Sequence, residues 1–354
     1  MTDDGRTPNA PADPEDDGAT MTQAPTPTAD TVRRLVRSLL GESAEPDVRP
    51  VTEGTEPATW WVGARCVLRL APDREAAVRQ RRELRLRELV RPYVSVAVPT
   101  SVAHGEWAPG LTYTLDAKVP GESGEDHDVS ALGEADLAAL LTGVREVPVG
   151  QAETLGVPRA APRSLETLRE AAERAARRLA EADEFDAARP ERLTRAATVQ
   201  LAAQPGAAVL VHHGLAGEHL VVGADGRVRG VLGWTDAVLG DPAEDIAGLA
   251  LSVGSPAAVR AATLAGYGAR PCLRGLWLAR CDTLVQLVAA LSGRSAASAS
   301  GPLPVPLPVS LLRTRLRRAW EPILLERVTE LREDGMDDSA AGGRDGGTGG
   351  GAPA

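Results

Sequence analysis

Three histidines, His212, His213 and His219, lie close together in the segment VHHGLAGEHL, with apolar residues on both sides. Imidazoles accept protons and bind metal ions, so this segment is a candidate for chemistry. One interpretation is a metal hydrolase in which Asp236 joins the three histidines. Their spacing matches no strong zinc pattern and no cysteine assists, which argues against it. For His212 and His213 the alternative is a core histidine that bonds nearby backbone.

The same segment has the framing of a loop that acts in phosphoryl transfer. Such a loop, H-x-D-x-x-x-x-N, supplies a base aspartate and, five residues later, a metal-binding side chain. With His212 first, Gly214 takes the base position and His219 the metal-binding position. A register that begins one residue later puts leucines at both positions. Neither register supplies the carboxylate, and Glu218 is the acid that remains within the loop.

The second metal-binding position also lacks an acid. The segment RVRGVLGWTDAVLGDPAEDIAGL runs from an apolar strand into Gly233, where an aspartate before the aromatic residue is expected. Asp236 is the nearest surviving carboxylate, but three residues span about 10 Å of extended chain. It can serve only if the backbone folds back. The imidazole of His219 is a poor ligand for Mg²⁺, which prefers oxygen. Further on, Asp241 and Glu244 resemble a helix cap.

The net charge of the 354-residue chain, −10, is concentrated at its ends. Residues 1–30 carry seven acids against Arg6, residues 333–354 carry five against Arg344, and the remainder holds 37 acids and 37 bases. A surface that binds nucleic acid needs an excess of lysine and arginine on one face. We therefore expect no nucleic-acid partner.

Other features of the composition indicate a cytoplasmic protein. The three cysteines are odd in number and widely spaced, which argues against a disulfide framework and fits a reducing compartment. The N-terminus is acidic and proline-rich, without the apolar stretch of a signal peptide. No run approaches the ~18 apolar residues of a membrane span, so we expect no membrane partner.

The pattern of elements predicts two lobes between two tails. Residues 1–30 and 333–354 cannot bury enough apolar surface to fold, and we expect both to be disordered. Residues 31–118 read as a β-rich N-lobe with a short helix, a hairpin around Gly63, an arginine-rich helix at 73–91 and the strand LTYTLDAKV. This strand leads to the turn pair Pro120-Gly121.

The character of the chain then changes to helical. Residues 119–332 contain the amphipathic stretch SLETLREAAERAARRLAEAD and the short β segments AAVLVH, HLVVG and RVRGVLGW, with a turn at Ala224-Asp225-Gly226. The pattern also predicts further helices at about 243–252, 256–268, 272–293 and 309–332. A β-rich lobe, a hinge and a helical lobe with a small β insert predict an α+β, two-lobed, protein-kinase-like fold.

These residues resemble the aminoglycoside and macrolide phosphotransferase family of small-molecule kinases. In that family the loop often reads HGDLGPEHLL and the metal segment viDWtDAglGDPaeDlA; here they read HHGLAGEHLVV and GWTDAVLGDPAEDIAGL. The resemblance covers about residues 32–330. It implies that Arg69 is the phosphate-binding cation, Glu83 its partner on a helix, and Asp245 a brace for the loop. The glycine-rich phosphate loop is reduced to Gly54.

The resemblance implies ATP as the nucleotide and a small hydroxylated molecule as the acceptor. Here Gly214 replaces the family's base and Gly233 its metal-binding aspartate. A missing base alone costs on the order of 10²–10⁴ in rate. Losing a metal carboxylate also removes charge neutralisation, which weighs against Mg²⁺. We therefore expect a catalytically impaired phosphotransferase, a pseudokinase, whose cleft still binds nucleotide or a hydroxylated ligand.

Two alternatives stay open at this point. In the first, the protein is an active ATP-dependent phosphotransferase in which Glu218 or Asp236 stands in as base or metal ligand. In the second, it is a scaffold or regulatory module that acts without any ligand. For Glu83, the alternative to an inward contact with Arg69 is a solvent pair with Arg79 or Arg87, its neighbours one turn away.

Overall fold

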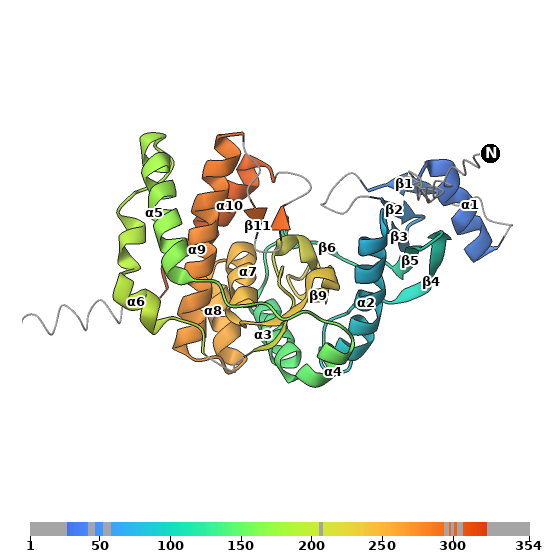
Figure 1. The fold of residues 1–354 in the computed structure, drawn as a ribbon, viewed down its shortest axis with the longest axis horizontal. Helices are drawn as coiled ribbons and strands as arrows, with labels where there is room; N and C mark the ends of the chain where they lie inside the picture. The colour runs from blue at the N-terminus through green and yellow to red at the C-terminus, as the bar shows by residue number, and fades with distance from the viewer. Residues whose placement is uncertain are drawn as a thin grey trace, which may run out of the picture.

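The computed structural model describes residues 27–41, 47–51, 58–204, 208–293, 297–298, 301–302 and 307–323. Within these residues the chain forms a β-rich lobe and a larger helical lobe, with short strands between them (Figure 1). This arrangement confirms the α+β, two-lobed fold expected from the sequence. The predicted tail at 333–354, nearly all of the tail at 1–30, and Gly54 lie outside the described residues.

The N-lobe is built on a five-stranded antiparallel sheet in the order β1-β2-β3-β5-β4. Its strands are β1 (Val48–Pro50), β2 (Thr59–Val62), β3 (Cys66–Leu70), β4 (Ser101–Ala108) and β5 (Leu111–Ala117). The predicted hairpin is present, because β2 and β3 pair around Gly63, whose φ of 56° suits the tight turn.

Two helices accompany this sheet, α1 (Ala29–Leu40) and α2 (Arg74–Val90). Helix α1 begins slightly before the predicted tail ends, because the hydroxyl of Thr28 accepts the N–H of Thr31 as an N-cap. Helix α2 matches its predicted span, and Asp73 caps it through the N–H of Ala76 at 2.7 Å. Helix α2 lies between the sheet and the rest of the protein (Figure 1).

The C-lobe is mainly helical. Its helices are α3 (Ala131–Glu146), α4 (Val149–Thr154), α5 (Leu165–Glu181), η1 (Arg189–Arg192), α6 (Arg195–Gln200), α7 (Ala243–Val253), α8 (Ser255–Leu264), α9 (Ala269–Leu291) and α10 (Val309–Ala319). Leucine, valine and alanine side chains from these helices share one large core with Trp234 and Trp277. None of the described helices is long and apolar enough to cross a membrane.

Short strands carry the loops of the candidate site. A three-stranded sheet has the order β6-β8-β9, from β6 (Glu122–Ser123), β8 (Leu220–Val222) and β9 (Val228–Val231). A second pair joins β7 (Val209–Val211) to β10 (Val238–Gly240). The single-turn helices η2 (Gly217–His219) and η3 (Trp234–Asp236) sit between these strands, and β11 (Ala297–Ser298) pairs with β12 (Gly301–Pro302).

Helix boundaries differ from the predictions most at the C-terminal end. A helix was expected over 309–332, but α10 ends at Ala319. Pro322 follows shortly after, and proline cannot continue a helix because it has no N–H and its ring clashes with the preceding turn. Residues 324–332 lie outside the described residues.

Candidate active site

Arg69 on β3 and Glu83 on α2 are in contact. Their side chains are joined by a hydrogen bond of 3.0 Å, and Glu83 is almost fully buried. The helix face of Glu83 carries Leu86 and Val90, both buried, which turns the carboxylate inward. The expected inward pairing of Arg69 with Glu83 is therefore present.

The pair belongs to a larger cluster that the sequence did not reveal. Asp116 on β5 lies 3.3 Å from Arg69 and 3.1 Å from Arg87, and Arg87 lies 3.6 Å from Glu83. Burial opposes ionisation of Glu83, but Arg69 and Arg87 outweigh it and hold its pKa below the usual value. Two arginines and two carboxylates thus balance one another. The available signal was a charged residue inside an otherwise buried strand.

Glu83 also connects the two lobes. Its carboxylate accepts a hydrogen bond of 2.6 Å from the hydroxyl of Thr235 in η3. The neighbouring Arg82 donates to the carbonyl oxygen of Thr235 at 2.9 Å. Two consecutive residues of α2 therefore hold the segment that follows Gly233, so the position of α2 and the geometry of the metal segment depend on each other.

Asp245 on α7 braces the histidine loop. Its two carboxylate oxygens accept the backbone N–H groups of His212 and His213, each at 2.9 Å. His213 has a positive φ of 64°, which is unusual for a residue with a side chain. The carboxylate holds the loop in this shape, in agreement with the role that the family resemblance implied for Asp245.

His212 is a buried histidine of the core. Its Nε2 lies 2.7 Å from the carbonyl oxygen of Leu232, so Nε2 carries the proton that this bond requires. Its ring packs edge-on against Trp234, with centroids 4.7 Å apart. Burial lowers the pKa of His212 to about 3, which keeps the ring neutral. These contacts favour a structural role for His212 in the core over a role in catalysis.

His212 and Asp245 have opposite effects on the pH dependence of stability. His212 has its pKa lowered from 6.5 to about 3, so its contribution is lost as the pH falls through that interval. Burial raises the pKa of Asp245 from 3.8 to about 7, so its contribution is present at low pH and lost as the pH rises through that interval. Between about pH 4 and 6.5, the two groups therefore change the free energy of unfolding with pH in opposite directions, and their effects largely cancel.

Replacing either His212 or Asp245 is expected to reveal the pH dependence that the other residue gives to the free energy of unfolding. From pH 6.5 to 4.5, the free energy of unfolding of His212→Gln should rise relative to the wild type by about 1.4 kcal/mol per pH unit. That of Asp245→Asn should fall by a similar amount. Urea unfolding at several pH values measures both. Slopes of the same sign in the two variants would refute this assignment.

His219 is oriented by the residue that stands at the base position. Its Nδ1 lies 2.5 Å from the carbonyl oxygen of Gly214. A carbonyl oxygen only accepts, so Nδ1 carries the proton and Nε2 presents its lone pair. A Cβ added at Gly214 would lie 3.5 Å from the His219 ring, an ordinary contact distance. The backbone therefore has room for a side chain at Gly214.

Gly233, by contrast, has no such room. It adopts a left-handed conformation with φ 74°, and an added Cβ would lie 2.4 Å from Cδ2 and 2.6 Å from Nε2 of His219. In the orientation seen here, the imidazole occupies the space that a Cβ at residue 233 would take, so the ring would have to move to admit a side chain. One ring therefore contacts both glycines that replace the acids of the family motif.

The proximity of His219 and Gly233 follows from the β8–β9 hairpin. Leu220 pairs with Val231, and the N–H of Leu232 donates to the carbonyl oxygen of His219 at 2.9 Å. The turn of this hairpin was predicted from Ala224-Asp225-Gly226. Counting outward from that turn pairs residue 219 with residue 231, and the irregularity between Val221 and Val222 shifts the partner by one residue toward Leu232, which the sequence does not reveal.

The two acids considered as substitutes are poorly placed for the task. Glu218 is held by Arg315 at 2.5 Å, and Arg315 also holds Glu125 at 2.5 Å. Partial burial opposes ionisation of Glu218, but Arg315 keeps its pKa below the usual value, which makes it a weak base. Asp236 is exposed at the end of η3, where Arg82 is a charged neighbour.

The residues at the two metal positions of the motif, His219 and Gly233, do not fit a magnesium ion, because neither supplies a side-chain oxygen. The nitrogen of His219 is also a poor substitute for oxygen ligands. For the metal hydrolase built on His212, His213, His219 and Asp236, Nε2 of His212 is already bonded to the carbonyl oxygen of Leu232.

Asp241 and Glu244 serve the packing of the C-lobe. The carboxylate of Asp241 accepts the N–H of Ala243 at 3.0 Å, which supports the expected cap at the start of α7. It also pairs with the buried Arg274 at 2.5 Å. Glu244 does not complete a capping box, because its carboxylate pairs with Arg163 at 2.7 Å.

Comparisons with known proteins agree with this fold. The model of the phosphotransferase enzyme family matches residues 47–276. Among solved structures, the GDP complex of aminoglycoside 2'-phosphotransferase-IIIa superposes with a TM-score of 0.59 and 19% identity, covering 81% of this chain and 96% of that one. The GDP and kanamycin complex of APH(2")-IIia superposes with a TM-score of 0.56 and 17% identity, covering 86% of this chain and 98% of that one.

A macrolide phosphotransferase is similar to a comparable degree. The apoenzyme of macrolide 2'-phosphotransferase MphH from Brachybacterium faecium superposes with a TM-score of 0.54 and 21% identity, covering 83% of this chain and 99% of that one. No curated protein sequence matches the chain. At these identities the solved structures establish the fold, and the family match over most of both lobes establishes membership: the chain belongs to the phosphotransferase enzyme family.

Proposed function

We propose that this protein binds a nucleotide between its lobes and has lost magnesium-dependent phosphoryl transfer. The observation that carries the proposal is the pair of glycines at the two acid positions, Gly214 and Gly233, which lie on either side of His219. Its ring fills the space beside Gly233, and its Nδ1 is bonded to the carbonyl of Gly214. A base and a metal-binding carboxylate are therefore both missing from the positions where the family motif has them.

The nucleotide class is proposed from Arg69 and from the named ligands of similar proteins. Arg69 stands on β3 beside Glu83, where the family resemblance puts the cation that contacts phosphates. The similar aminoglycoside phosphotransferases were solved as complexes with GDP or with GDP and kanamycin. We therefore propose ATP or GTP as the nucleotide and a small hydroxylated molecule as the second ligand.

Within this proposal, active transfer through Glu218 is disfavoured because Arg315 holds that carboxylate. A cytoplasmic location goes with the proposal, since Cys66, Cys272 and Cys281 are free thiols.

A thermal-shift titration tests nucleotide binding. At a nucleotide concentration of 100 Kd, binding stabilises the folded state by about 2.7 kcal/mol, which corresponds to a rise of roughly 4–5 °C in Tm for a chain of this size. We expect the same rise with ATP in excess Mg²⁺ and in excess EDTA. A rise that requires Mg²⁺ would contradict the loss of the metal site.

Arg69→Met is expected to remove most of this nucleotide-induced rise, measured against its own Tm without ligand. Arg65→Met is the matched control, because Arg65 lies exposed in the turn before the same strand. Equal rises in both variants would show that Arg69 does not contact the nucleotide. No rise with any nucleotide would favour the scaffold alternative.

A further inference from the structure

Nε2 of His219 is an unprotonated ring nitrogen at the metal-binding position of the histidine loop. Because Nδ1 is bonded to the carbonyl oxygen of Gly214, the proton of the neutral imidazole stays on Nδ1 and the lone pair lies on Nε2. Among the described residues, none forms a hydrogen bond with Nε2. A histidine nitrogen with its lone pair unused is a nucleophile that forms covalent intermediates in enzymes.

The ring of His219 is held in one orientation. The backbone carbonyl oxygen of His219 accepts the N–H of Leu232 at 2.9 Å, and the ring centroid lies 5.5 Å from that of His212. Nε2 lies 2.6 Å from the point that a Cβ at Gly233 would occupy. This nitrogen is therefore placed between the two metal-binding positions of the motif, residues 219 and 233.

Both of these positions belong beside the phosphates of a nucleotide. In phosphoryl transfer of this kind, the side chains at the two positions hold the metal ions that contact the β- and γ-phosphates. A nucleoside triphosphate bound as proposed above would therefore bring its γ-phosphate next to Nε2. Arg69 would supply positive charge to the phosphates. The inference thus rests on the proposed nucleotide site.

We propose that His219 takes the γ-phosphoryl group of the bound nucleoside triphosphate on Nε2. The lone pair of Nε2 forms the N–P bond, the bond between the γ-phosphorus and the bridging oxygen breaks, and its electron pair leaves with the nucleoside diphosphate. No base is needed, because Nε2 carries no proton and Nδ1 keeps its own. The acceptor is a nitrogen of the protein itself, whereas the lost reaction transfers to a hydroxyl that requires the base missing at Gly214.

Other histidines of the described chain are placed less well for this reaction. His212 is buried, and its Nε2 is already bonded to the carbonyl oxygen of Leu232. His104 and His127 are exposed, but they lie on β4 and before α3, outside the loop. These two exposed histidines therefore serve as matched controls.

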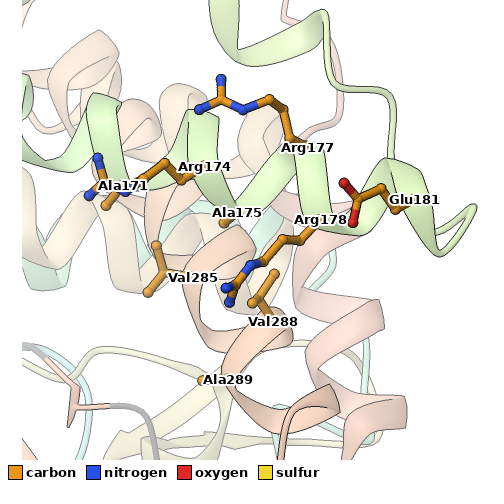
Figure 2. A pocket seen from close by; sticks show the side chains of 9 residues that line it. All are labelled: Ala171, Arg174, Ala175, Arg177, Arg178, Glu181, Val285, Val288 and Ala289. Carbon is orange, nitrogen blue, oxygen red and sulfur yellow. The ribbon is translucent and has the colours of Figure 1, made fainter.

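A basic groove on the C-lobe is a competing place for nucleotide phosphates. A cavity of about 490 Å³ lies between α5 and α9, and the exposed Arg174, Arg177 and Arg178 line it (Figure 2). None of the described residues that line it is a histidine. Nucleotide held there would raise Tm without phosphorylating a histidine. The triple variant Arg174→Gln, Arg177→Gln and Arg178→Gln separates the two places.

Incubation of the purified full chain with γ-labelled ATP or GTP and Mg²⁺ in a slightly alkaline buffer tests the inference. Protein-bound label should map to His219 by mass spectrometry, withstand alkali and be lost in acid, as an N–P bond requires. His219→Asn should carry at least about tenfold less label while it keeps the nucleotide-induced rise in Tm. His104→Asn, His127→Asn and the groove variant should be labelled like the wild type.

The outcomes separate this inference from the proposed function. A nucleotide-induced rise in Tm without label on the wild type would overturn the inference and leave the proposed nucleotide site intact. Absence of both the rise and the label would overturn the two together. Label that persists in His219→Asn, or that survives acid, would place the phosphoryl group on another residue and would also overturn the inference.

Discussion

Replacing Gly233 with aspartate is expected to lower stability without creating a magnesium site. Aspartate tolerates the left-handed backbone better than most residues, so the conformation itself is a small part of the cost. The larger part is the contact of 2.4 Å that its Cβ would make with the His219 ring. Overpacking of this kind costs about 1–3 kcal/mol. Urea unfolding measures the loss, and a Mg²⁺ titration of ATP binding should stay flat.

Removing the His219 ring in the same variant is expected to restore stability and to allow Mg²⁺ to bind. In Gly233→Asp with His219→Asn, the carboxylate gains its space and the amide supplies the oxygen that Mg²⁺ prefers. Adding Gly214→Asp restores the base, which is worth on the order of 10²–10⁴ in rate. We therefore expect ATP turnover to rise above the wild type only in the triple variant.

Gly214→Asp alone is the control for this series. Because an added Cβ at Gly214 meets nothing closer than 3.5 Å, this variant should fold with nearly wild-type stability and show no gain in turnover. If Gly233→Asp alone kept wild-type stability and bound Mg²⁺, the ring of His219 would not be the obstacle.

Glu83→Gln is the second substitution with a large expected effect. Glu83 contacts Arg69 and Arg87, so its neutralisation removes the charge that balances the buried Arg87 and the partly buried Arg69. Removing one partner of a buried ion pair costs about 3–5 kcal/mol. The free energy of unfolding from urea denaturation measures the effect.

The matched control on the same helix is Glu75→Gln. Glu75 pairs with Arg79 at 2.5 Å, but its side chain is 82% exposed. An exposed pair one turn apart contributes roughly 0.3–0.5 kcal/mol, so this variant should stay near the wild type. Losses of equal size in the two variants would contradict the importance of the buried cluster.

The sequence predicted the two lobes and most elements because each depends on local patterns. Alternating apolar residues indicated β2 and β3, and the apolar stripe of α5 followed helical spacing. The helix expected over 309–332 is interrupted after Ala319, shortly before Pro322, and its part at 324–332 lies outside the described residues. Element types were therefore more predictable than the points where elements end.

The candidate site was less predictable because it depends on contacts between distant segments. The pairing of Arg69 with Glu83 was expected from the family resemblance and from the face of α2. Asp116 and Thr235 were missed, since each reaches Glu83 or its partners from another element. Whether Gly54 and Arg69 contact phosphate stays a prediction.

The most direct test of the central claim is product formation by the wild-type protein. Purified protein is incubated with γ-labelled ATP or GTP, Mg²⁺ and a panel of aminoglycosides, macrolides and other hydroxylated molecules, and labelled product is counted. With the base position at Gly214 and the metal position at Gly233, we expect product no faster than in the absence of protein, although nucleotide binds. Labelled acceptor that accumulates with the wild type and disappears with Asp236→Ala would contradict this account.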